Sequence, residues 1–237
     1  MKKTIVLLAL ISLTATAFSN DWKPLFNGNN LDGWVVKTKG SPAGKNPWNL
    51  FRAQDGVLTV SYADFDKEKF NDEFGHLFTA KAYTNYRFRC EYRFIGEQVP
   101  GAPKWAFANS GIMLHCPPPS KMGVHQSFPH SAEFQLLGVN RTTGSLFTPG
   151  CTVAYNGEAN RAKPVKSTIP ALPLGEWVKA EAVVQDGKIQ HWINGELVME
   201  YSNPRLMDGT PMRSGHIALQ AESHPCQFRN IEILELD

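Results

Sequence analysis

The sequence predicts an all-β protein, a β-sandwich or a barrel, and two observations lead to this fold class. Short segments in which apolar and polar residues alternate recur along the chain, which is the period of half-buried strands. Glycine, proline, asparagine and aspartate separate these segments. The chain shows no long amphipathic helix, tandem repeat or low-complexity tract that would point to another class.

The first residues, MKKTIVLLALISLTATAFSN, have the layout of a secretory signal peptide. Lys2 and Lys3 precede an apolar run that is too short to span a bilayer, and small residues follow it. Cleavage is predicted near Ala17 or Ser19, so residues 1–19 are a leader and the mature protein is exported, to the periplasm or the outside of the cell. Residues 21–237 are long enough for a single large β domain.

Composition limits the partners of the mature protein. The full chain has 24 basic and 22 acidic residues, and the leader removes two lysines and no acid, which leaves the two signs balanced. A balanced charge argues against nucleic acid or an anionic membrane as a partner. The four cysteines have no zinc-site spacing, and in an exported protein they are either free or joined in one of three full pairings: Cys90, Cys116, Cys151 and Cys226.

The clearest strands lie in VVQDGKIQHWINGELVMEY (residues 183–201). Asp186-Gly187 and Asn194-Gly195 are favoured two-residue hairpin turns, and each lies between alternating apolar runs. Three antiparallel strands in a meander are therefore predicted. Upstream, the polar side of YRFRCEYRF (residues 86–94) carries arginines and a glutamate, which indicates a charged outer face with cross-strand pairs.

A further strand is predicted in SAEFQLLG (residues 131–138). Because Phe134 and Leu136 alternate with Glu133 and Gln135, the pleat must place the two polar residues on the face opposite the core. That face is either a solvated surface or the floor of a site. Two long segments rich in Pro, Gly, Asn and Thr flank this strand, and loops of that length are commonly functional: residues 116–130 and 139–175.

Polar residues of neighbouring strands extend this face. SGIMLHC is predicted to put Met113 and His115 on one side, with His115 either in a site or a structural histidine. GHIALQAE is predicted to put four residues on another side: His216, Ala218, Gln220 and Glu222. Trp105, in a Gly/Pro-rich loop before Asn109, is a candidate aromatic platform beside this face, and the Pro149-Gly150 turn is a candidate wall.

Five segments, in this order, resemble the 3-keto-disaccharide hydrolase family over most of the mature chain. They are LFNGNNLDGWVV, NSGIMLHC, SAEFQLLG, GEWVKAEAVVQDGKIQHWINGELVMEY and GHIALQAESHPCQFRNIEIL. The resemblance implies a concanavalin A-like or LamG-like jelly roll, a β-sandwich of two antiparallel sheets whose concave face holds carbohydrate. It also implies cleavage of glycosides already oxidised to a ketone at sugar carbon 3. One departure is His115, which stands where many members have arginine.

The residues fit this chemistry better than ordinary glycoside hydrolysis. The Glu-x-Asp-x-x-Glu pattern of jelly-roll glucanases is absent, because Phe134 to Leu137 follow Glu133. In a 3-keto sugar the carbonyl acidifies the hydrogen on carbon 2, so one base can start an elimination of the carbon 1 substituent, and hydration completes net hydrolysis. The predicted catalytic residues are Glu133, His115 and Glu222, and the predicted substrate-binding residues are Gln135, Gln220, Trp105 and Asn109.

Two alternatives remain open at this level. Glu133 and Glu222 are hard oxygen ligands that could instead hold a divalent cation. The whole domain could also be a non-catalytic carbohydrate-binding sandwich or, more remotely, a protein-interaction sandwich. A binding module needs aromatic platforms and amides rather than several ionisable groups on facing strands, so Glu133, Glu222 and His115 favour an enzyme.

Overall fold

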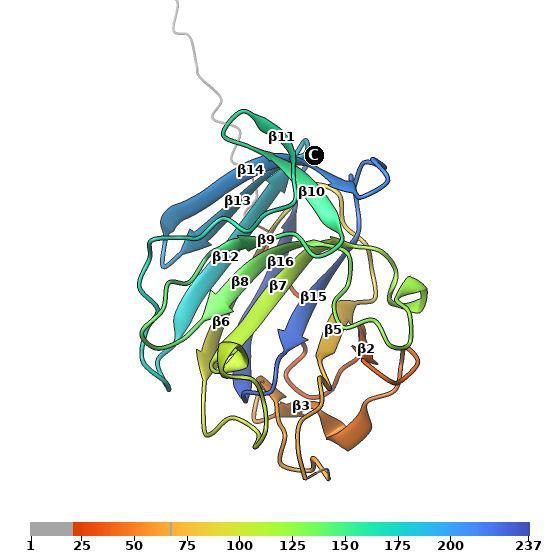
Figure 1. The fold of residues 1–237 in the computed structure, drawn as a ribbon, viewed down its shortest axis with the longest axis vertical. Helices are drawn as coiled ribbons and strands as arrows, with labels where there is room; N and C mark the ends of the chain where they lie inside the picture. The colour runs from red at the N-terminus through yellow and green to blue at the C-terminus, as the bar shows by residue number, and fades with distance from the viewer. Residues whose placement is uncertain (1–20, 67) are drawn as a thin grey trace, which may run out of the picture.

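The computed structural model describes residues 21–66 and 68–237, and these residues form two antiparallel β-sheets packed face to face (Figure 1). Within this part of the chain, ten strands form the large sheet and six form the small sheet. The predicted all-β sandwich of two antiparallel sheets is confirmed. The predicted leader, residues 1–19, lies outside the described residues.

The strands of the large sheet are given in their order across it: β11 (Glu158–Arg161), β10 (Cys151–Tyr155), β14 (Glu196–Leu206), β13 (Lys188–Ile193), β12 (Val178–Gln185), β6 (Tyr86–Phe94), β16 (Cys226–Glu235), β4 (Val57–Val60) and β3 (Phe51–Gln54), with β1 (Lys23–Pro24) paired to β16. The order of the small sheet is β2 (Trp34–Thr38), β5 (Gly75–Thr79), β15 (His216–Ala221), β7 (Asn109–Cys116), β8 (Ala132–Leu137) and β9 (Leu146–Phe147). Short 3-10 helices lie in the connections: η1 (Pro47–Asn49), η2 (Lys104–Ala106) and η3 (Pro119–Lys121).

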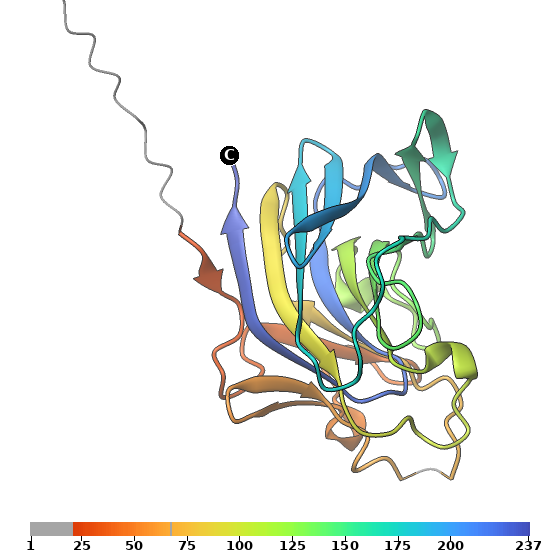
Figure 2. The same cartoon turned by 90° about the vertical axis from the view of Figure 1, so that its left-hand side faces the viewer.

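The predicted meander is strands β12, β13 and β14. Both of its turns have the two positive φ angles that a tight hairpin of matching twist requires, 50° and 77° at Asp186-Gly187 and 49° and 85° at Asn194-Gly195. These two dipeptides therefore fix the register of the large sheet's central strands, which lie beside the long pair β6 and β16 (Figure 2).

The core lies between the two sheets, and strand alternation decides which side chains enter it. From the large sheet, Tyr86, Phe88 and Tyr92 of β6 point inward, and from the small sheet Phe134 and Leu136 of β8 do the same. Burial of side chains of this size contributes about 1.5–3 kcal/mol each. The polar residues between them are consequently forced onto the outer faces of the sheets.

The outer face of the large sheet is a ladder of paired charges. Arg87 contacts Glu181 and Arg89 contacts Glu232 at 2.7 Å, each across neighbouring strands. The Trp22 ring centroid lies 3.9 Å from the Arg89 Cζ atom. The cross-strand pairing predicted for residues 86–94 is confirmed, and the charges on this face are neutralised locally.

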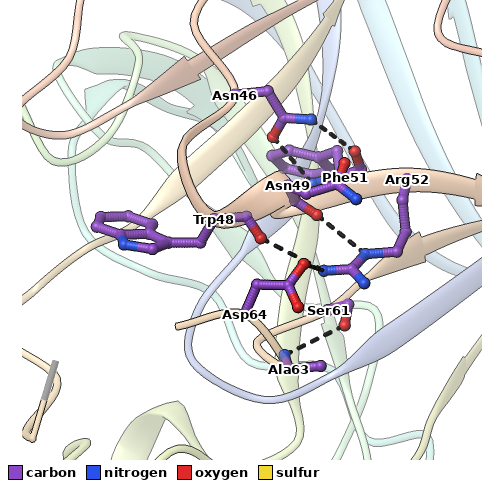
Figure 3. A network of polar contacts seen from close by, with 8 residues as sticks. All are labelled: Asn46, Trp48, Asn49, Phe51, Arg52, Ser61, Ala63 and Asp64. Atoms are coloured by element: carbon purple, nitrogen blue, oxygen red, sulfur yellow. Dashed lines mark hydrogen bonds and ion pairs between the residues drawn. The ribbon is translucent and has the colours of Figure 1, made fainter. Parts of the chain in front are cut away.

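Polar side chains also fasten the edge of the large sheet at β3 (Figure 3). Asn46 brackets the backbone of Phe51, since its amide donates to the Phe51 carbonyl at 2.7 Å and its Oδ1 accepts from the Phe51 N–H at 3.1 Å. Arg52 donates to the Asn49 carbonyl and to Asp64. This network holds the turn before β3 in place.

The four cysteines are buried free thiols in the described part of the chain: Cys90, Cys116, Cys151 and Cys226. Of the alternatives left open by the sequence, the free form is the one that the structure contains. No helix within residues 21–66 and 68–237 has the length and apolar character needed to cross a membrane.

Candidate active site

The outer face of the small sheet carries the candidate site. Strand β7 lies between β8 and β15, and the register aligns Met113 with Glu133 on one side and with Ala218 on the other. Since side chains alternate along each strand, Glu133 and Gln135 share this outer face with Gln220. The three neighbouring strands thus bring together polar residues that are far apart in the sequence.

Loops wall this face to form a cavity of about 340 Å³, which is within the usual range of about 300–1,000 Å³ for small-molecule sites. Five of the predicted site residues line it: Glu133, Gln135, Asn109, Glu222 and Trp105. The predicted wall is present in Phe147, Thr148 and Pro149, and three further residues complete the lining: Phe128, Ala162 and Pro164.

Gly111 makes room for the polar residues above the middle strand. A Cβ at this position would lie 2.8 Å from Glu133 Oε1 and 3.2 Å from Gln220 Oε1, so any side chain would displace both groups. Gly111 has ordinary strand dihedral angles, and the glycine is required here by the close approach of two side chains rather than by backbone conformation. Gln220 itself is 1 % exposed and lies beneath the cavity.

Glu133 and Glu222 are both deeply buried, and their carboxyl groups interact with each other. Burial raises the pKa of Glu133 above its ordinary value, although a hydrogen bond from Gln220 opposes the increase. Burial also raises the pKa of Glu222, and the negative charge of Glu133 adds to the increase, while Arg141 opposes it. Both carboxyls therefore keep their protons to a higher pH than an exposed glutamate does, and the ionisation of one makes the ionisation of the other harder.

Aromatic side chains form one rim of the cavity. Trp105, in η2, is 52 % exposed and packs at a tilt on Phe74, with 5.8 Å between ring centroids. Phe74 in turn stacks on Phe128 of the loop at residues 117–131, at 5.1 Å. Trp105 therefore presents a supported, solvent-exposed ring face beside the two carboxyl groups.

His115 does not lie with these residues, and the predicted face for it is wrong. Strand β7 bulges opposite β15, where His216 aligns with Cys116 but Ala218 aligns with Met113, and His115 has a φ of 57°. The bulge turns the imidazole toward the inter-sheet core, where it packs edge-on against Tyr86 at 6.1 Å. His216 is held separately, with Nδ1 at 2.7 Å from the Thr79 carbonyl.

Arg141 is a site residue that the sequence did not reveal. It follows β8 in the long segment of residues 139–175 and reaches back to the loop that carries Trp105, where it donates to the Trp105, Phe107 and Ala108 carbonyls. Its charge also acts on Glu222. No periodic pattern surrounds it, so only the length of the predicted loop pointed to this segment. The prediction of a loop without strands is wrong for residues 139–175, which contain β9, β10 and β11.

The donor set does not resemble a dedicated metal centre. No group of three or more His, Cys, Asp and Glu side chains suited to a metal ion occurs within residues 21–66 and 68–237. Glu133 and Glu222 are the two carboxyls available for a cation, with Gln220 as a neutral oxygen donor whose Oε1 has no hydrogen-bond partner in this part of the chain.

Comparison with known proteins identifies the family of the chain. The sequence profile of the 3-keto-alpha-glucoside-1,2-lyase-like domain matches residues 21–234. The chain belongs to this family. No curated protein matches it significantly.

Solved structures agree on the fold. Two proposed glycosyl hydrolases from Parabacteroides distasonis are similar, one at 20 % identity with a TM-score of 0.58, covering 91 % of this chain and 94 % of that one. The other has 21 % identity and a TM-score of 0.55 and covers 92 % and 100 %. The beta-glucanase of Bacillus licheniformis has 13 % identity and a TM-score of 0.55 over 92 % and 98 % of the two chains. The jelly-roll architecture implied by the resemblance is confirmed, and membership of the family makes this a carbohydrate-active protein.

Proposed function

We propose that this protein is an exported enzyme that cleaves 3-keto-glycosides, including 3-keto-disaccharides, by elimination and hydration. The observation that carries the proposal is the pair of buried carboxyl groups, Glu133 and Glu222, on one cavity large enough for a sugar ring. A pKa raised toward neutrality by burial suits a residue that must both take up and return a proton. The family match supports 3-keto-glycosides as the substrate class.

In the proposed first step, the Glu133 carboxylate removes the hydrogen from carbon 2, next to the ketone. The electron pair of that bond forms the double bond between carbons 1 and 2 as the bond to the carbon 1 oxygen breaks. Glu222, whose protonated form is favoured by burial and by the negative charge of Glu133, gives its proton to the departing oxygen. The enolate oxygen that develops at carbon 3 is stabilised by amide donors, for which Asn109 and Gln135 line the cavity.

The second step reverses the proton transfers and restores both groups. Glu222, now ionised, accepts a proton from water as its oxygen adds to carbon 1 of the unsaturated ketone. Glu133 returns its proton to carbon 2. The net reaction is hydrolysis, and each carboxyl ends in the protonation state in which it began.

The alternative of a binding module is weaker on physical grounds. Keeping two carboxyls buried side by side destabilises the fold, and a module that only holds sugar gains nothing from it. The exposed Trp105 ring and the amides of the cavity suit a binding module as well as an enzyme, so only the carboxyl pair distinguishes the two alternatives.

The deciding experiment incubates the purified protein with a 3-keto-glycoside and with the same glycoside not oxidised, and follows release of the leaving group. Glu133→Gln should keep the fold and lower turnover by about two to four powers of ten, the scale of general base catalysis. Glu196→Gln, at an exposed hairpin, is the control and should leave turnover unchanged. Deuterium at carbon 2 should slow the wild-type reaction, because that bond breaks.

Two further arms separate the roles. Glu222→Gln should slow a substrate with an alkyl or sugar leaving group far more than one with a nitrophenol, which needs no proton to leave. A chelator should leave turnover unchanged if Glu133 is the base, whereas loss with chelator and rescue by added cation would make the pair a metal site. No release from any 3-keto-glycoside, with binding retained, would show that the domain is a binding module.

A further inference from the structure

We infer that Arg141 is a positioning residue that clamps the loop of residues 103–108, and with it the Trp105 ring, into a fixed platform beside Glu133 and Glu222. The substrate-facing part of this inference rests on the proposed function, and the part that concerns the loop does not. Arg141 is half-buried and lies on a different connection from the loop it holds.

The contacts of Arg141 are directed at the loop backbone. Nη1 donates to the Trp105 carbonyl at 3.0 Å, and Nη2 donates to the Ala108 carbonyl at 2.7 Å and to the Phe107 carbonyl. Asn109 adds a bond from its amide to the same Trp105 carbonyl at 3.3 Å. Charged donors to backbone carbonyls are worth more than neutral ones, about 1.5–3 kcal/mol each.

The loop needs such a clamp because it ends in a strained residue. Ala108 has a φ of 41°, in the left-handed region that a residue with a Cβ seldom adopts. Its carbonyl accepts from Arg141 and also from the Gly138 N–H at 2.9 Å. Gly138 must be glycine for this approach, since a Cβ there would lie 2.9 Å from the Phe94 ring and 3.1 Å from the Ala108 Cβ. Asn109, which lines the cavity, follows immediately.

A second anchor ties the loop to the strand end that carries Glu222. Gln98 donates to the Pro103 carbonyl at 3.0 Å and to Ser223 Oγ at 2.9 Å. Ser223 directly follows Glu222 and has a φ of 79°. The loop is thus fixed between the segment after β8, the strand that carries Glu133, and the segment after β15, which contains Glu222.

The consequence is a platform that is ordered before substrate arrives. An aromatic ring on a free loop would lose conformational entropy on stacking with a sugar, at about 0.5–1.5 kcal/mol for each immobilised side chain and more for the backbone. Arg141 removes that cost in advance, so its loss should weaken binding through Trp105, and this effect is separate from the action of its charge on Glu222.

The test uses Arg141→Gln and Arg141→Lys, with Arg205→Gln as the matched control, because Arg205 likewise donates to a loop carbonyl, that of Gly209 at 3.0 Å, away from this cavity. Hydrogen exchange of the backbone amides of residues 104–109, measured without substrate, should speed up by roughly tenfold to a hundredfold in Arg141→Gln. Arg141→Lys should be intermediate, and the control should match wild type. Unchanged exchange in a folded Arg141→Gln protein overturns the clamp, whether or not the protein acts on 3-keto-glycosides.

The link to substrate is tested by a double-mutant cycle with Trp105→Ala. Arg141→Gln should raise KM by about tenfold in wild type and by much less in the Trp105→Ala background. Loss of the Arg141 charge should also raise the pKa of Glu222, but equally in both backgrounds, so this effect cancels in the cycle. An equal rise of KM in the two backgrounds would show that Arg141 does not act through Trp105, and would overturn the inference.

Discussion

Replacing Gly111 by alanine tests the geometry of the carboxyl site directly. The new methyl group would lie 2.8 Å from Glu133 Oε1, whereas ordinary contact begins at 3.4 Å, so the carboxyl must move by about 0.6 Å or the strand must shift. Gln220 Oε1, at 3.2 Å, would be pushed from the other side. Alanine would not strain the backbone at this position, because Gly111 does not have a positive φ.

The expected result combines a modest loss of stability with a large loss of activity. Forcing a methyl group into a packed site costs about 1–3 kcal/mol. A misplacement approaching 1 Å of a catalytic group can lower turnover by about a hundredfold, and Gln220 would lose its hydrogen bond to Glu133 at the same time. Turnover on a 3-keto-glycoside at saturating substrate measures the second effect, and thermal unfolding measures the first.

Gly195→Ala is the control for general destabilisation. Gly195 has a φ of 85° with no atom near its missing Cβ, so alanine there strains the hairpin by about 1 kcal/mol without touching the site. It should unfold at lower temperature and keep full turnover. Wild-type turnover in Gly111→Ala, or an equal loss in Gly195→Ala, would refute the assignment of Glu133 as the reacting group above Gly111.

Two more predictions concern stability. Because burial raises the pKa of Glu133 and of Glu222 above the ordinary value of 4.5, the folded protein holds these protons more tightly than the unfolded chain does. The resulting stability is complete below pH 4.5 and is lost as the pH rises through the folded pKa. Glu133→Gln should therefore flatten the fall of Tm between about pH 5 and pH 8, while Glu196→Gln should not. A slope in Glu133→Gln equal to that of the wild type would contradict the buried pair. Since all four cysteines are free thiols, a reductant should leave Tm unchanged, and a drop equivalent to about 2–4 kcal/mol on reduction would instead reveal a disulfide.

Strand alternation predicted the site face because a pleated strand has only two sides. Once Phe134 and Leu136 were assigned to the core, Glu133 and Gln135 had to face outward, and the structure places them there. The same argument failed for His115, since a bulge of one residue reverses the side on which a residue lies and alternation contains no sign of it. The Asp186-Gly187 and Asn194-Gly195 turns succeeded because their conformation is local.

Arg141 shows what local patterns leave out. It acts on the backbone of residues 105 to 108, more than thirty positions earlier in the chain, and a hydrogen bond to a carbonyl requires no particular partner side chain. Gly111 was equally inconspicuous, since its role depends on two side chains from other strands. The roles of Arg141 and Gly111 can be assigned only when the register of β7, β8 and β15 is known.

The two outer faces of the sandwich differ in whether their polar groups have partners, and this difference supports the cavity on the small sheet as the proposed site. On the large sheet, cross-strand partners neutralise the charges, as in Arg229 with Glu91 at 2.7 Å, so the face is stable without a ligand. On the small sheet, Gln220 Oε1 and Glu222 Oε2 are buried and have no hydrogen-bond partner among the described residues. Each such atom destabilises the fold by about 1–3 kcal/mol.

The same small region contains two strained residues, Ala108 and Ser223, each directly adjacent to a residue that lines the cavity. Buried carboxyls, unsatisfied oxygens and left-handed backbone would each be removed by simple substitutions if stability alone mattered. At the cavity these features occur together beside the two carboxyls, whereas on the outer face of the large sheet charges such as Arg229 and Glu91 contact each other across strands. This arrangement, together with the family, supports the proposal that Glu133 and Glu222 take part in the reaction.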